Sequence, residues 1–127
     1  MWVQYNPNPV QGNAGDCAVR AVSKALNTDW ETDYAIIATN GFLMGDVISS
    51  NAVWGSVLRQ HGFKREIVPN ECPDCYTLED FSVDHQNGIY VVALPNHVAT
   101  IVDGHIYDAW DSSKEKPLYY WVKEDEK

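Results

Sequence analysis

Apolar residues recur at helical spacing in the first half of the chain. From Cys17 to Leu26 they fall where one broad face of an α-helix would carry them. Asp16 is suited to the N-cap, because its carboxylate can accept a hydrogen bond from an unpaired backbone N–H. The pattern therefore predicts a helix over Cys17–Leu26, with Cys17 in its first turn.

Further helices are expected before the middle of the chain. Thr28 and Glu31 form a capping-box pattern, and Thr77 can cap a short helical turn. The expected elements are a helix from Thr28 to about Thr39, a helix between its cap Asp46 and Gly62, a strand over 63–68, a loop over 70–76 and a helical turn over 77–84.

The hydrophobic pattern changes in the second half. Runs of β-branched and aromatic residues predict strands over 89–94, 97–102, 105–110 and 118–122, with a charged tail over 123–127. Residues 1–16 are expected to be loop or extended chain. Because helices come first and antiparallel strands second, we predict an α+β fold in which N-terminal helices pack on a C-terminal antiparallel sheet.

Length and composition fit one domain over residues 1–127. A chain of 127 residues has the usual size of a single domain, and its 45% of hydrophobic residues can form a core without disulfides. No internal repeat or linker interrupts the pattern. The sequence does not indicate the oligomeric state.

Charge and targeting signals narrow the function classes. The net charge of -9 would repel phosphates, which argues against a nucleic-acid partner. The first ten residues lack the basic start and apolar run of a signal peptide, and no stretch approaches the roughly 20 apolar residues of a membrane span. Three cysteines are too few for a disulfide framework. We therefore expect a cytoplasmic protein with no membrane partner.

The expected hairpin brings a histidine close to an aspartate. Asp103-Gly104 is a strong two-residue turn signal, and this turn places His97, Asp108 and Trp110 on one face of the sheet. His97 and Asp108 are then diagonal neighbours, roughly 7–8 Å apart at the backbone. A carboxylate beside an imidazole orients the ring and stabilises its protonated form.

Cys17 would lie where a thiolate is stabilised. A helix N-terminus carries roughly half a positive charge, which lowers the pKa of a nearby thiol. A nucleophilic thiol also needs a base such as a histidine. If the first helix packs on the sheet, then Cys17, His97 and Asp108 could meet as nucleophile, base and orienting group.

Three segments resemble the papain-like cysteine peptidases. The stretch QGNAGDC, from Gln11 to Cys17, resembles that family's Q-G-x-C-G-S-C segment. His97-Val98-Ala99 resembles its H-A-V strand, and Asp108-Ala109-Trp110 resembles its N-S-W. An aspartate in place of the asparagine is similar to the compact, bacteriocin-leader-processing branch of the superfamily.

The resemblance implies a compact papain-like fold and a cysteine peptidase that cleaves an amide bond in a peptide or protein, without a cofactor or metal. It assigns Cys17 as the nucleophile, His97 as the base and acid, and Asp108 as the group that orients His97. It also implies an oxyanion hole formed by Gln11 and the backbone N–H of Cys17. A substrate site is expected at Gly15, Asn96 and Trp110, and Trp110 is also expected to cover the pair of His97 and Asp108.

Three other functions are compatible with these residues. An acyl transferase or isopeptidase would use the same thiol chemistry with a different acceptor or bond. A peptidase fold without activity would act as a protein-binding module. A small zinc-binding interaction domain could be built on Cys72 and Cys75, which form half of a zinc-site pattern. The same two cysteines could instead serve as a redox or disulfide pair.

Overall fold

The structure has an α+β architecture with one mixed sheet. The computed structural model describes residues 1–10, 15–68 and 75–124. Within these ranges the elements are β1 (Trp2–Gln4), α1 (Cys17–Leu26), α2 (Trp30–Met44), α3 (Asn51–Gln60), β2 (Phe63–Ile67), α4 (Leu78–Asp84), β3 (Ile89–Leu94), β4 (His97–Val102), β5 (His105–Asp108) and β6 (Tyr119–Lys123).

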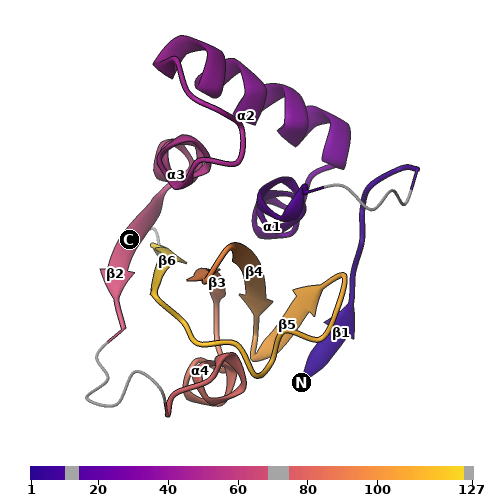
Figure 1. Ribbon diagram of the computed structural model, residues 1–127. Helices are drawn as coiled ribbons and strands as arrows, with labels where there is room; N and C mark the ends of the chain where they lie inside the picture. The colour runs from indigo at the N-terminus through magenta and orange to yellow at the C-terminus, as the bar shows by residue number, and fades with distance from the viewer. Residues whose placement is uncertain (11–14, 69–74, 125–127) are drawn as a thin grey trace.

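The sheet lies between two unequal helical layers. Its strand order is β1-β5-β4-β3-β6-β2. The helices α1, α2 and α3 cover one face, and the short helix α4 covers the other (Figure 1). Because α1 packs chiefly on β4, a central strand, its first residue can reach the end of the sheet where β4 begins.

The core has two parts, one on each face of the sheet. On the side of α1 and α3, Val22 and Trp54 pack against Val91, and all three are buried. On the side of α4, Phe81 packs with Ile101 in a second buried cluster. The alternation of side chains along each strand divides the apolar residues between the two parts.

The central elements follow the sequence pattern. The structure confirms the expected helix over Cys17–Leu26 and the strands over Ile89–Leu94 and His97–Val102. It also confirms the hairpin at Asp103-Gly104, where Val102 pairs with His105. The helical turn after Thr77 is present, with a capping box between Thr77 and Asp80.

The expected limits of α2 were wrong. The helix begins at Trp30, because its N-cap is Asp29, whose side chain accepts a hydrogen bond from the N–H of Thr32. The Thr28 hydroxyl donates instead to Asp33 Oδ2 at 2.5 Å. At the other end, the helix continues to Met44 and stops at Gly45, whose positive φ of 67° ends it in a left-handed cap.

The third helix and two strands also differ from expectation. Ser50, not Asp46, lies at the N-cap of α3, and Asp46 accepts a hydrogen bond from the N–H of Val47 next to it. The strand β5 ends at Asp108 rather than at residue 110, and β6 runs over Tyr119–Lys123 rather than 118–122.

The sheet is neither purely antiparallel nor confined to the C-terminal half. The strand β1, which was expected to be loop or extended chain, pairs in parallel with β5 at one edge. At the opposite edge, β2 comes from the helical half of the chain and pairs with β6. A three-residue strand carries too little alternation to be recognised, and a parallel partner follows only from the tertiary arrangement.

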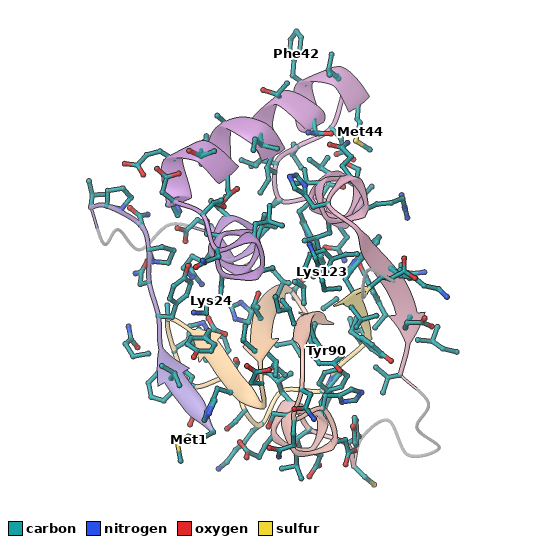
Figure 2. All side chains as sticks on the ribbon, turned by 180° about the vertical axis from the view of Figure 1, so that it is seen from behind. Met1, Lys24, Phe42, Met44, Tyr90 and Lys123 are labelled. Carbon is teal, nitrogen blue, oxygen red and sulfur yellow. The ribbon has the colours of Figure 1, made fainter. Side chains whose placement is uncertain are left out.

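The end of α2 exposes several apolar side chains. Phe42 projects from the helix on the side away from the sheet, and Met44 lies at the end of the same helix (Figure 2).

Across the described residues, no helix is long and apolar enough to cross a membrane.

We predict that Gly55→Ala destabilises the fold. A Cβ at Gly55 would stand 2.8 Å from Cζ2 of Trp121, a buried ring. Overpacking costs about 1–3 kcal/mol, which outweighs the roughly 1 kcal/mol that alanine contributes by helix propensity. The free energy of unfolding in urea should therefore fall by about 1 kcal/mol. Ser56→Ala, one residue further, is the control and should change it by less than about 0.5 kcal/mol. A more stable Gly55→Ala variant would contradict the close contact.

Candidate active site

Three element ends meet at one end of the sheet. Cys17 is the first residue of α1, His97 is the first residue of β4, and Asp108 is the last residue of β5. Because β4 and β5 are antiparallel, the start of one lies beside the end of the other. The three side chains that the sequence singled out are therefore brought to one place by three separate elements.

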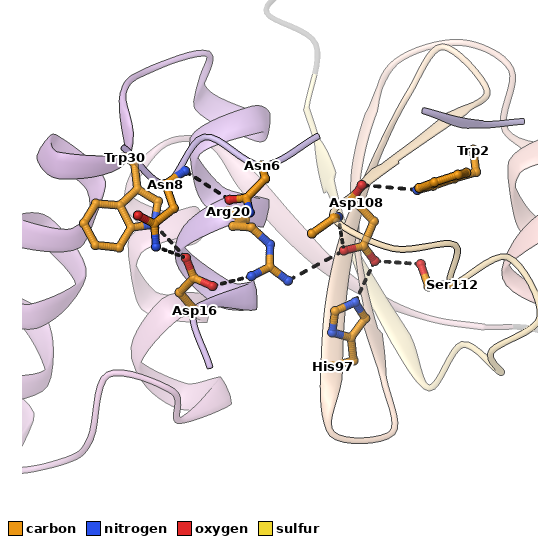
Figure 3. Close-up of polar contacts among 10 residues, drawn as sticks. Trp2, Asn6, Asn8, Asp16, Arg20, Trp30, His97, Asp108 and Ser112 are labelled. Carbon is orange, nitrogen blue, oxygen red and sulfur yellow. Dashed lines mark hydrogen bonds and ion pairs between the residues drawn. The ribbon is translucent and has the colours of Figure 1, made fainter. Parts of the chain in front are cut away.

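These side chains form a continuous hydrogen-bonded series. The thiol of Cys17 is hydrogen-bonded to the side chain of His97. The ring nitrogen Nε2 of His97 lies 2.6 Å from Oδ2 of Asp108 (Figure 3). Because Nε2 is engaged by the carboxylate, Nδ1 is the ring nitrogen left for the sulfur. The geometry is that of a nucleophile, a base and an orienting group.

The surroundings of this pair differ from the hairpin prediction. The predicted register put His97 and Asp108 on the same face as Ile101 and Ile106, and the latter two pack against α4. His97 and Asp108 instead contact α1, on the opposite side. The ladder between β4 and β5 ends at the pair Thr100 and Tyr107, so His97 and Asp108 are not joined through it and pair instead with Leu94 of β3 and Gln4 of β1. Proximity was predicted correctly, and the face was not.

The environment of Cys17 favours its thiolate. Burial works to raise the pKa of the thiol, but the hydrogen bond to His97 and the positive charge of His97 lower it. A hydrogen bond with the backbone of Val98 and the charge of Arg20 act in the same direction. The net result is a thiol pKa below its ordinary value of 9.0.

The environment of His97 favours its protonated form. Burial works to lower the pKa of the imidazole, but the hydrogen bonds to Asp108 and Cys17 and their negative charges raise it to about 9. The two opposite shifts have one cause, because each group stabilises the charged form of the other. His97 is therefore protonated around neutral pH, and its charge favours the thiolate form of Cys17.

Asp108 is held in place by contacts from several segments. It is buried, with 3% of its surface exposed. The Ser112 hydroxyl donates to Oδ2 at 2.7 Å, and the N–H of Ala109 donates to Oδ1 at 2.7 Å (Figure 3). Its backbone carbonyl accepts hydrogen bonds from Trp2 Nε1 and from the N–H of Tyr5. The carboxylate that orients His97 thus has a fixed position.

A buried arginine connects two carboxylates around the site. Arg20 Nη1 forms an ion pair with Asp16, and Arg20 Nη2 lies 3.7 Å from Oδ1 of Asp108 (Figure 3). Asp16 also accepts hydrogen bonds from Asn8 Nδ2 and Trp30 Nε1. Asp16 lies at the N-cap position, but its side chain makes no capping hydrogen bond, contrary to expectation. The carboxylate next to the thiol is neutralised by Arg20 instead.

Sequence reasoning missed Arg20 and Ser112. Asp16 and Arg20 stand at i and i+4 with the acid first, which is a favourable spacing for an ion pair on a helix and could have been noticed. The role of Ser112 has no comparable signal, because this residue comes from the turn after β5 and only the fold brings it to Asp108.

One half of the expected oxyanion hole belongs to the described residues. The backbone N–H of Cys17 lies in the first turn of α1, where the helix itself supplies no acceptor. Gln11, expected to supply the second donor, lies outside the described residues. Of the two expected oxyanion donors, the structure therefore describes one, the N–H of Cys17 at the start of α1, beside the thiol.

The thiol opens into a cleft of about 700 Å³, called the catalytic cleft below. Gly15 and Asn96 line it, together with Cys17 and His97. Trp110 does not line it but lies against the imidazole, with ring centroids 4.7 Å apart and ring planes at 34°. Of the three expected substrate-site residues, two border the cleft and the third, Trp110, covers His97.

Cys75 is not among the described residues that line the cleft. Cys75 is disulfide-bonded, while Cys72 lies outside the described residues. Over 1–10, 15–68 and 75–124, no group of three His, Cys, Asp or Glu side chains is placed to hold a metal ion.

The chain matches no protein-family model, no curated protein and no solved structure. Its function is therefore inferred from the chemistry of the site.

We predict that Cys17 reacts with iodoacetamide well below pH 9. The thiol pKa lies below its ordinary 9.0, so thiolate is present at lower pH, and His97 stays protonated up to about pH 9. In His97→Ala the stabilising charge is lost while burial remains, so alkylation at pH 6.5 should be at least about tenfold slower.

His105→Ala is the control for this measurement, because His105 is exposed at the start of β5. Alkylation rates read by peptide mass spectrometry should be equal for this variant and the wild type. Equal rates for His97→Ala and the wild type would contradict the ion pair.

We predict that Arg20→Met is strongly destabilising and that Asp16→Asn partly restores stability. Removing one partner leaves a buried carboxylate unpaired, which costs about 3–5 kcal/mol. In the double variant one of these charges is gone, so the loss measured by urea unfolding should be smaller than in Arg20→Met. Additive losses from the two substitutions would show that the buried pair is not coupled.

Proposed function

We propose that the protein is a papain-like cysteine peptidase, a thiol hydrolase that cleaves an amide bond in a peptide or protein. The observation that carries the proposal is the hydrogen-bonded series from Cys17 through His97 to Asp108, which opens into the catalytic cleft. The position of the thiol at the start of a helix adds support, because it favours the thiolate.

The first step forms a thioester. The thiolate of Cys17 attacks the carbonyl carbon of the scissile amide, and a carbon–sulfur bond forms while the carbonyl oxygen becomes an oxyanion. The N–H of Cys17 stabilises this oxyanion, and Gln11 is proposed as the second donor. The His97 imidazolium donates its Nδ1 proton to the leaving nitrogen as the carbon–nitrogen bond breaks, which releases a free amine.

The second step regenerates the thiolate. His97, now neutral, accepts a proton from a water molecule that attacks the thioester carbonyl. The carbon–sulfur bond then breaks, and a carboxylic acid product leaves. Asp108 keeps Nδ1 of His97 directed at the sulfur and stabilises the imidazolium that is present before and after turnover. Trp110 limits the access of water to this pair from one side.

The catalytic cleft favours uncharged residues next to the scissile bond. Apart from Cys17 and His97, the described residues that line it carry no ionisable side chain. Trp54, Leu94 and Val98 make one part of it apolar. A charged substrate side chain would lose hydration there without gaining a partner, so apolar or amide side chains fit better.

The proposal is tested by incubating the protein with a mixture of peptides and reading new termini by mass spectrometry. We expect cleavage by the wild type and none above background for Cys17→Ala. Asp108→Asn should retain more activity than Asp108→Ala, because an amide oxygen can still accept from His97, whereas removal of the oriented base costs on the order of 10²–10⁴ in rate.

Two outcomes would favour the other functions. Hydroxamate products that form in hydroxylamine at the expense of hydrolysis, with little cleavage in water, would indicate an acyl transferase. A Cys17 that alkylates rapidly without cleaving any peptide or isopeptide would overturn the peptidase and favour a binding module.

A further inference from the structure

A second hollow, of about 420 Å³, lies beside the catalytic cleft. It runs between α3 and the strands β2 and β6, and we call it the arginine groove. Its wall includes Arg59, Arg65, Tyr119, Trp121 and Gly55. The proposed reaction needs none of these residues.

The arginine groove and the catalytic cleft share both walls. Asn51, the first residue of α3, lines both hollows. On the other wall, Leu118 lines the catalytic cleft, and Tyr119, the next residue, lines the groove. An extended chain that leaves the cleft along α3 would therefore enter the groove.

The two arginines in this groove have no acidic partner among the described residues. Neither makes an ion pair with another residue in the described part of a chain whose net charge is -9. On the same strand, Lys64 pairs with Glu66, but both alternate with Arg65 and belong to the other face of the sheet. Two uncompensated cations in an acidic protein indicate a surface that binds an anion.

Aromatic rings hold the guanidinium groups in place. The Cζ atom of Arg65 lies 4.2 Å from the ring centroid of Tyr119, and that of Arg59 lies 5.2 Å from the Trp121 ring. Stacking on a ring restrains the plane of the guanidinium and leaves its N–H edge for a ligand. Such an edge matches the two oxygens of a carboxylate.

The length of the groove sets the position of that carboxylate. Arg59 follows Asn51 by about two turns of α3, or about 12 Å along the helix axis. An extended peptide covers about 3.3 Å per residue, so about four residues span the distance. The acidic side chain would lie beyond the neutral residues that occupy the catalytic cleft.

We propose that the arginine groove binds an aspartate or glutamate side chain of the substrate, at least about four residues from the scissile bond. This inference rests on the proposed peptidase function and names its substrate class: peptides with neutral residues at the cleavage point and an acidic residue farther along one side.

The test uses decapeptide libraries capped at both ends, so that the only charges are those of side chains. Each library fixes glutamate, glutamine or lysine at one position, and cleavage is read by mass spectrometry. We expect the wild type to prefer glutamate over glutamine by about tenfold at one position, four or more residues from the cut, and to disfavour lysine there. The preference should decline as NaCl is raised, because these charges are exposed.

The groove is then tested by substitution. Arg59→Gln/Arg65→Gln should lose the preference for glutamate, and Arg59→Glu/Arg65→Glu should prefer lysine. Lys64→Gln removes the same charge from the opposite face of β2 and should keep the wild-type preference. The salt dependence of the wild type needs no variant, so it decides the question even if an arginine variant does not fold.

Cleavage that depends on Cys17 but shows no preference for glutamate at any position would overturn this inference and leave the proposed function intact. A preference that persists in Arg59→Gln/Arg65→Gln, or that is lost in Lys64→Gln, would also overturn it. No cleavage of any peptide would overturn the proposed function and this inference with it.

Discussion

The arrangement of the site depends on one buried carboxylate. The carboxylate of Asp108 is buried, and His97, Ser112, Arg20 and the N–H of Ala109 supply partners for its oxygens. These partners come from β4, from the turn after β5 and from α1, so satisfying one charge aligns three segments. The parallel strand β1 adds backbone contacts to Asp108 from the edge of the sheet. The loss of any one partner would therefore change both the packing of α1 and the orientation of the histidine.

The charges near the sulfur alternate in sign. Asp16, Arg20, Asp108, His97 and the thiolate of Cys17 form a series in which each neighbour carries the opposite charge when the site is in its ion-pair form. This order explains how an aspartate can precede a reactive cysteine. The negative charge of Asp16 is paired with Arg20, whose other guanidinium nitrogen lies beside Asp108. The charge that acts most strongly on the thiolate is therefore that of His97.

Helix α3 forms one wall of both the catalytic cleft and the arginine groove, and its packing on the sheet fixes the position of that wall. Gly55 lets the helix approach the ring of Trp121 closely, and the same ring carries the guanidinium of Arg59. The wall is neutral beside the thiol and cationic farther along. Neither Arg59 nor Arg65 is among the groups that shift the pKa of Cys17 or His97, so the cationic groove and the charged pair at the thiol are electrostatically separate.

Local patterns in the sequence determined the helix over Cys17–Leu26, the strands on either side of Asp103-Gly104 and the closeness of His97 to Asp108. The reason is that helical periodicity, strand alternation and turn preferences act between residues that are near each other in the chain. Only the tertiary structure decided on which face of the sheet the histidine and the aspartate meet. It also decided that Arg20 joins two carboxylates and that β1 and β2 form the edges of the sheet. These features depend on contacts between segments far apart in sequence. The hydrophobic periodicity of a single segment cannot predict such contacts, because they form only when burial of the core packs α1 onto β4.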